Sequence, residues 1–209
     1  MYTVKETYYT LQGEGGQTGR AAVFCRFAGC NLWSGMEKDR ATAQCRFCDT
    51  DFVGTNGPGG GKFGTADSLA DHIAACWPIG HGRRLVVFTG GEPLLQLDGW
   101  ITSAMHDRSF EVAVETNGTV VPPAGIDWMT VSPKGRNALQ VSAGTELKLV
   151  YPQPDALPER FADLQFQHWF LQPMDGPDQH ANTQAALRYC LDHPQWRMSL
   201  QTHKLLRIP

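Results

Sequence analysis

The chain of 209 residues lacks an excess of basic side chains. It has 18 Lys and Arg against 21 Asp and Glu, which gives a formal net charge of -3. Proteins that bind the phosphate backbone of nucleic acids usually carry a basic excess or a basic stripe. The composition therefore argues against a nucleic-acid partner, and we expect a small-molecule substrate.

The sequence also lacks an apolar run long enough to cross a bilayer, so we expect no membrane association. Residues 1–6 lack the charged and apolar regions of a secretory leader, and we expect a cytoplasmic protein. Because disulfides are rare in that reducing compartment, the six cysteines are not expected to form a disulfide framework. With 42% hydrophobic residues, residues 1–209 are expected to form a single domain.

Three of the cysteines stand close together in the sequence. Cys30, Cys45 and Cys48 follow an apolar run, 21–27, in the order Cys-x14-Cys-x2-Cys. Thiolates in such a pattern suit a soft metal. Structural zinc usually takes a fourth ligand, and Cys25 is a poor one because it lies inside the apolar run, which alternates like a strand. The spacing alone leaves zinc and an iron-sulfur cluster open.

Further short apolar runs indicate strands of a parallel sheet, at 85–88, 110–114, 128–131, 147–150 and 168–171. Residues 68–75 and 183–191 have helical patterns, whereas 122–127 is too short and proline-rich for a crossover helix. We predict an α/β fold, an incomplete (partial) TIM-like barrel of about six parallel strands with a reduced number of helices. The glycine-rich segment 55–64 is expected to be a flexible loop.

Polar residues follow several of these predicted strands. Gly90-Gly91-Glu92-Pro93 follows the strand at 85–88, and the others are 115–118, 132–134 and 172–175. Loops at the carboxyl ends of parallel strands meet at one edge of the sheet, so we expect one shared site beside the cysteines. There Glu92 would pair with an ammonium group, although Gly-Gly-Glu-Pro could also be only a tight turn.

The three-cysteine loop, with Phe47 directly before the last cysteine and Gly-Gly-Glu-Pro after the next strand, resembles the radical S-adenosylmethionine superfamily. The usual motif there is Cys-x3-Cys-x2-Cys, so this chain carries an insertion of eleven residues, fourteen minus three, near 32–44. Within the superfamily the chain is similar to the 7-carboxy-7-deazaguanine synthase family of the queuosine pathway. The segments that carry this similarity are 11–15, Arg26, 48–50, 132–134, 172–175, 201–204 and 208–209.

The resemblance implies a set of cofactors. Cys30, Cys45 and Cys48 would hold a 4Fe-4S cluster whose free iron binds S-adenosylmethionine, and Thr50 would hold Mg²⁺. The S-adenosylmethionine contacts would be Phe47, Cys48, Asp49, Gly91, Ser132, Pro133, Lys134, Gln172, Pro173, Met174 and Asp175. Read without the family, Lys134 could equally be a solvated surface lysine.

The resemblance also implies the reaction, a lyase step that converts 6-carboxy-5,6,7,8-tetrahydropterin to 7-carboxy-7-deazaguanine with loss of ammonia. The implied substrate contacts are Leu11, Gln12, Gly13, Glu14, Arg26, Thr89 and the terminal carboxylate of Pro209. The backbone of 11–13 would face the pterin edge, Glu14 would accept its N–H groups, and Arg26 would pair with its carboxylate in a bidentate manner. Read alone, residues 11–15 could be only a turn. No residue is assigned as a catalytic acid or base, and His203 and Glu115 are left without a role.

As partners, the resemblance implies an electron donor such as flavodoxin and a homodimer. Two other hypotheses stay open at this point. One is an activating enzyme that makes a glycyl radical on a partner protein, and the other is a zinc-stabilised binding module.

Overall fold

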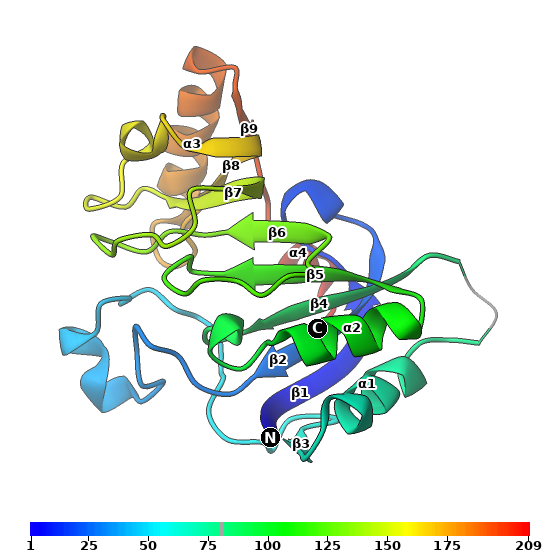
Figure 1. Cartoon of the computed structure of the whole chain (residues 1–209). Coiled ribbons are helices and arrows are strands. Elements are labelled where there is room, and N and C mark those ends of the chain that lie inside the picture. The colour runs from blue at the N-terminus through cyan, green and yellow to red at the C-terminus, as the bar shows by residue number, and fades with distance from the viewer. Residues whose placement is uncertain (80–81) are drawn as a thin grey trace.

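The computed structural model describes residues 1–79 and 82–209 and contains a sheet of nine strands (Figure 1). The strand order is β3-β1-β2-β4-β5-β6-β7-β8-β9. From β2 to β9 all neighbours run parallel, while β1 is antiparallel to both β2 and β3. The bounds are β1 Tyr2–Leu11, β2 Ala21–Phe27, β3 Gly61–Phe63, β4 Arg84–Gly90, β5 Phe110–Thr116, β6 Trp128–Val131, β7 Ala143–Tyr151, β8 Gln165–Pro173 and β9 Trp196–Met198. The predicted α/β class is confirmed, as are all six strands expected from apolar runs.

The sequence did not reveal three of the strands, β1, β3 and β9. β1 is rich in Thr and Tyr and carries Lys5 and Glu6 in its middle, so it lacks the continuous apolar run of a strand covered on both faces. β3 and β9 have three residues each, too few for a pattern. Consequently the run at 21–27 is the second strand of the chain rather than the first.

The loop predicted at 55–64 is confirmed for residues 55–60, whereas Gly61–Phe63 form β3. Thr7 donates its backbone N–H to the carbonyl of Pro58 at 2.7 Å, and Gly57 donates to that of Lys5 at 3.0 Å. The glycines permit this approach, because a Cβ atom on Gly60 would lie 2.2 Å from the carbonyl oxygen of Lys5. The segment is therefore packed along β1 and leads into β3.

Helices α1 and α2 pack against each other beside β1, β2 and β4, whereas α3 lies at the other end of the sheet against β8 and β9 (Figure 1). Thr65 and Asp98 cap the first turns of α1 and α2 by accepting backbone N–H groups. The helices are α1 Ala66–Ala75, α2 Gly99–Asp107, α3 Gln179–Asp192 and α4 Thr202–Leu206, with short 3-10 helices η1 Gly15–Gln17, η2 Glu37–Thr42, η3 Pro93–Leu95 and η4 Pro158–Phe161. No helix in the described part of the chain is both long and apolar enough to span a membrane. As predicted, no helix lies between β5 and β6.

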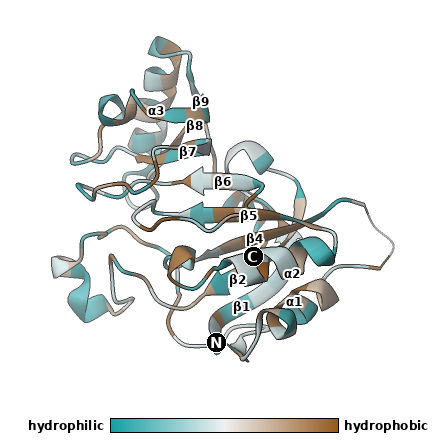
Figure 2. Ribbon diagram, in the orientation of Figure 1, coloured by the Kyte–Doolittle hydropathy of each residue, from teal (hydrophilic) through white to brown (hydrophobic). Residues whose placement is uncertain are grey.

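Apolar strands form the middle of the molecule. Figure 2 shows β4 as a largely brown, hydrophobic strand, and its residues 85–88 are fully buried. One face of β4 packs Val86 and Phe88 against Ile73 of α1 and Ile101 of α2. Burial on both faces fixes the strands, so the loops at their carboxyl ends start from a rigid base.

Candidate functional site

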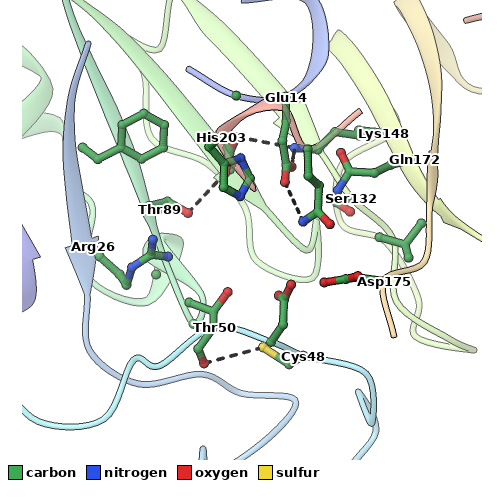
Figure 3. Close-up of a pocket in the computed structure, with 18 of the residues that line it drawn as sticks. Glu14, Arg26, Cys48, Thr50, Thr89, Ser132, Lys148, Gln172, Asp175 and His203 are labelled. Atoms are coloured by element: carbon green, nitrogen blue, oxygen red, sulfur yellow. Dashed lines mark hydrogen bonds and ion pairs between the residues drawn. The ribbon is translucent and has the colours of Figure 1, made fainter. Parts of the chain in front are cut away.

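A cavity of about 430 Å³ opens at the carboxyl ends of the parallel strands. It is lined by the loop after β1, the three-cysteine loop, the ends of β4 to β8 and the last residues of the chain. Figure 3 shows Arg26, Thr50 and Cys48 on one side of this cavity and Glu14, Lys148 and Gln172 on another. The predicted site residues that line it are Leu11, Gln12, Gly13, Glu14, Arg26, Cys45, Phe47, Cys48, Asp49, Thr50, Thr89, Gly91, Ser132, Lys134, Gln172, Pro173, Met174, Asp175 and Pro209. Two predicted residues do not line it, Cys30 and Pro133.

The three cysteines of the loop lie near one another. Burial raises the pKa of Cys45, and the neighbouring Cys48 and Cys30 raise it further. Burial also raises the pKa of Cys30, whose sulfur accepts the backbone N–H of Leu32 at 3.4 Å. Within residues 1–79 and 82–209 no three His, Cys, Asp or Glu side chains, the three loop cysteines included, are grouped as ligands of a single metal ion.

Cys25 is excluded as a fourth ligand, as the sequence indicated. It is completely buried in β2, among the core residues that include Val23 and Phe27. Burial raises the pKa of its thiol to about 12, and the closed core around β2 leaves no space for a metal ion at its sulfur.

Gly91 and Glu92 pack the end of β4 against the cysteine loop. A Cβ atom on Gly91 would lie 2.6 Å from the Cβ atom of Cys30, so only glycine fits there. The expectation that Glu92 pairs with an ammonium group is wrong. Its carboxylate is fully buried and accepts hydrogen bonds from the Thr116 hydroxyl at 2.7 Å and the Asn117 N–H at 2.7 Å. Glu92 therefore ties two strand ends together and does not face the cavity.

A buried charge network crosses the cavity wall. Lys148 of β7 is 4% exposed, forms an ion pair with Glu14 and lies 3.5 Å from a carboxylate oxygen of Glu115. Gln12 donates to Glu115 at 3.1 Å, and the Thr89 hydroxyl donates to it at 3.3 Å. The network thus places two carboxylates and one ammonium group where a polar ligand would contact them (Figure 3).

These charges perturb one another. Burial alone would raise the pKa of Glu14, but the Lys148 ammonium group holds it well below its usual range. Burial would lower the pKa of Lys148, but Glu115 and Glu14 raise it instead. Sequence reasoning missed Lys148, although a lysine inside the apolar strand Leu147–Val150 signals a buried partner.

Arg26 lies in the cavity wall with two partners from β1. Its Nε donates to Glu6 at 2.8 Å and its Nη2 donates to the Tyr8 hydroxyl at 3.2 Å. The sequence predicted that a buried arginine needs a partner, and Glu6 supplies one. These bonds fix the orientation of the guanidinium in the wall of the cavity, which Thr50 also lines (Figure 3).

The backbone of 11–13 is less available to a ligand than the sequence suggested. Gln12 donates its N–H to Arg20 and accepts the N–H of Gly19, both at 2.8 Å. The carbonyl of Gly13 accepts two hydrogen bonds from Thr202 at 2.9 Å. The polar groups of this segment that face the cavity are therefore chiefly side chains.

Lys134 lines the cavity and is not a solvated surface residue. Its Nζ donates to the hydroxyl of Ser132 at 2.5 Å and lies 6.0 Å from the ring centroid of Phe47. Burial lowers its pKa, while the nearby Cys45 and Cys48 act in the opposite direction. The lysine therefore places a positive charge beside two of the three thiols.

The last helix closes one side of the cavity. Lys204 of α4 donates to Asp49 of the cysteine loop at 2.6 Å and to Asp175, after β8, at 2.5 Å. Gln201 donates to the free oxygen of Glu14 at 3.0 Å. The cysteine loop and the end of β8 are thus joined through the C-terminal segment, a contact that sequence reasoning did not find.

Parallel strands whose carboxyl ends surround a charged cavity, with a three-cysteine loop at its mouth, define an α/β protein built to bind a small molecule. A comparison with protein-family models found no match. Curated relatives named 7-carboxy-7-deazaguanine synthase match instead, and they align over the full chain. The relative from Bordetella pertussis is 67% identical and that from Caulobacter vibrioides 63% identical, each over 100% of this chain and 99% of the relative.

A solved structure agrees with these sequences. The crystal structure of QueE from Escherichia coli has a TM-score of 0.71 and 26% identity, over 96% of this chain and 93% of that one. The chain therefore belongs to the 7-carboxy-7-deazaguanine synthase family.

Proposed function

We propose that this chain is a radical S-adenosylmethionine lyase that converts 6-carboxy-5,6,7,8-tetrahydropterin to 7-carboxy-7-deazaguanine and ammonia in queuosine biosynthesis. The observation that carries the proposal is the cavity, which brings together residues from seven separate segments that the sequence had assigned to cluster, cofactor and substrate. Full-length similarity to synthases of this name supports the same reaction. Neither a zinc-stabilised module nor a glycyl-radical activating enzyme has comparable support.

The cluster would be held by Cys30, Cys45 and Cys48. When bound, the cluster and S-adenosylmethionine supply the 5′-deoxyadenosyl radical that removes the hydrogen atom at C6 of the pterin. Cys45 and Cys48 open into the cavity and Cys30 packs behind Gly91, so a cluster there would sit at the cavity wall. The protein's own tasks are then to hold C6 near the radical carbon and to exclude water.

S-adenosylmethionine would lie along the side of the cavity nearest the cysteines. The residues proposed to contact it are Phe47, Cys48, Asp49, Gly91, Ser132, Pro133, Lys134, Gln172, Pro173, Met174 and Asp175. Pro133 does not line the cavity, and its carbonyl accepts a hydrogen bond from Gln153 at 3.3 Å. Its role would be to position Ser132 and Lys134, which do line the cavity. Asp49 and Asp175 offer carboxylates to a cationic ligand, in a region where Lys204 now holds both.

The pterin would bind in the same cavity, in contact with Leu11, Gln12, Gly13, Glu14, Arg26, Thr89 and Pro209. The guanidinium of Arg26, fixed by Glu6 and Tyr8, would bind the substrate carboxylate. Glu14 would accept N–H groups of the pterin edge once Gln201 releases one of its oxygens. Thr50, which lines the same cavity, would hold Mg²⁺ through its hydroxyl together with that carboxylate.

The proposal extends to the whole molecule. Residues 1–209 form a single domain, and the open sheet is an incomplete TIM-like barrel. The enzyme is a cytoplasmic homodimer that receives its electron from a donor such as flavodoxin. A reducing compartment would keep the cluster thiols free for iron, which is consistent with the six free cysteines of the structure.

The test is anaerobic reconstitution with iron and sulfide, followed by incubation with reductant, S-adenosylmethionine, Mg²⁺ and the carboxytetrahydropterin. We expect ammonia and 7-carboxy-7-deazaguanine in equal amounts. A protein that cleaves S-adenosylmethionine but leaves the pterin unchanged would refute the proposed substrate. A colourless protein with one tightly bound zinc would refute the radical chemistry.

A further inference from the structure

The inserted residues between Cys30 and Cys45 form a small folded unit. Trp33 is buried and contacts the ring of Phe52 edge-on, with 5.6 Å between ring centroids. The guanidinium of Arg40, which comes from η2, lies over the Trp33 ring at 4.1 Å from its centroid. The insertion therefore has an apolar contact of its own and presents Arg40 at a fixed place.

Arg40 reaches back to the turn that carries the last two cysteines. Its Nη1 donates to the carbonyl oxygens of Arg46 and Cys48, each at 3.0 Å. These two carbonyls lie on either side of Phe47. The guanidinium thus joins two backbone carbonyls of the Cys45–Cys48 turn.

The other side of the guanidinium is also occupied. Its Nε donates to both carboxylate oxygens of Glu37 at 2.8 Å. The start of the turn is tied to the insertion separately, because the N–H groups of Gln44 and Cys45 both point to the carbonyl of Leu32, at 3.1 and 3.4 Å. Both ends of the turn are therefore fixed by inserted residues.

A lysine could not replace this arginine. Stacking on an aromatic face requires the planar guanidinium, and an ammonium group is a compact point charge on a flexible stem. Arg40 uses its plane for Trp33, its Nε for Glu37 and its Nη1 for the turn. The pattern is specific to arginine.

We propose that Arg40 is a positioning residue that holds the Cys45–Cys48 turn in the shape that receives the cluster, which gives the inserted segment a structural role. This inference rests on the proposed function, since it assumes that the turn binds an iron-sulfur cluster. The positive charge of Arg40 beside the Cys48 carbonyl also favours an added electron on a nearby anionic cluster.

The test compares Arg40→Gln and Arg40→Lys with two matched controls, after anaerobic reconstitution of the full chain. Lys38→Gln removes a positive charge from the same 3-10 helix, at a side chain that forms no hydrogen bond with residues 45–48 in the described part of the chain. Glu37→Gln keeps the bonds from Arg40 to the carbonyls. The readouts are the rate at which an iron chelator bleaches the cluster absorbance and the reduction potential followed by electron paramagnetic resonance.

We expect Arg40→Gln to lose the cluster at least about fivefold faster than the parent, as the loss of charge-assisted hydrogen bonds predicts, and to have a lower reduction potential. Arg40→Lys should restore retention only in part, and both controls should stay within about twofold of the parent. Equal retention in Arg40→Gln and the parent would overturn the proposal, as would an equal defect in Lys38→Gln.

A second readout needs no cluster. In the apoprotein, trypsin should cleave after Arg46 at least about threefold faster in Arg40→Gln than in the parent, because the turn opens more often. An unchanged cleavage rate would contradict the role of Arg40 in shaping the turn. A different outcome would refute the proposed function instead. In it, Arg40→Gln is cleaved faster than the parent, but the parent itself assembles no cluster, so the turn does not bind one.

Discussion

The substitution Lys148→Met removes the one cation at the centre of the buried charge network. Lys148 lies in β7, its side chain is 5% exposed, and its ammonium group pairs with Glu14 and lies 3.5 Å from Glu115. Methionine has a similar volume, so the change leaves no large cavity and tests the charge rather than the packing.

Two carboxylates then remain without their cation. Removing one member of a buried ion pair destabilises a protein by about 3–5 kcal/mol, because the other charge stays buried and unpaired. Glu14 keeps its hydrogen bond from Gln201, and Glu115 keeps those from Gln12 and Thr89. Because these bonds compensate in part, we expect a loss at the lower end, about 3 kcal/mol. Adding Glu14→Gln to the variant should recover at least about 1 kcal/mol.

The assay is urea unfolding of the apoprotein, with Lys62→Met as the matched control. Lys62 is an exposed lysine on β3, and its loss should change the free energy of unfolding by less than about 0.5 kcal/mol. The pH dependence gives a second check. Since Lys148 lowers the pKa of Glu14 to about 2, the pairing stabilises the fold fully above the ordinary glutamate pKa of about 4.3 and is lost progressively as the pH falls from there to about 2.

The difference between the parent and Lys148→Met should therefore shrink as the pH falls from about 4.3 towards 2. A loss below about 1 kcal/mol at pH 7 would refute the reasoning, because a pair worth so little behaves as a solvent-exposed one. A difference that stays constant down to pH 3 would also refute it, since the Glu14 charge would then play no part.

Three further predictions follow from single contacts. Thr50→Ala should reduce Mg²⁺ stimulation of product formation more than it reduces S-adenosylmethionine cleavage, whereas Thr50→Ser should keep both. Equal losses of the two in Thr50→Ala would count against magnesium at this hydroxyl. Lys204→Ala should increase amide hydrogen exchange in α4 at least several-fold, because Asp49 and Asp175 lose their shared cation. Unchanged exchange would show that these two ion pairs do not hold α4 in place. Glu92→Gln should cost about 1–3 kcal/mol in urea unfolding, because the N–H groups of Leu94 and Asn117 point to different carboxylate oxygens and an amide has only one accepting oxygen; a neutral effect would contradict the buried role assigned to Glu92.

The parts of the fold that the sequence predicts are those with continuous apolar runs. Residues 85–88 are covered on both faces, so their pattern is unambiguous, and the same holds for the other central parallel strands. β1 could not be found this way because it pairs antiparallel with β2 and carries polar residues such as Lys5 and Glu6 between its apolar ones. Its identity as a strand depends on partners that lie elsewhere in the chain.

The site was predictable where chemistry requires a particular residue type. The thiols of Cys45 and Cys48 and polar residues at strand ends, such as Ser132 and Lys134, do converge on one cavity. The role of Glu92 was predicted wrongly, because the sequence does not show that Thr116 and Asn117 reach its carboxylate. Contacts that depend on how distant segments meet, such as the one from Lys204 to Asp49, become visible only in the folded chain.

The central claim is that the cavity holds C6 of the pterin at the radical carbon, and a deuterium-transfer measurement tests it most directly. The reconstituted enzyme would be given substrate deuterated at C6, and the 5′-deoxyadenosine formed would be analysed by mass spectrometry. The account predicts one deuterium atom in the 5′-deoxyadenosine, together with 7-carboxy-7-deazaguanine. Unlabelled 5′-deoxyadenosine, with the deuterium still on the pterin, would contradict it.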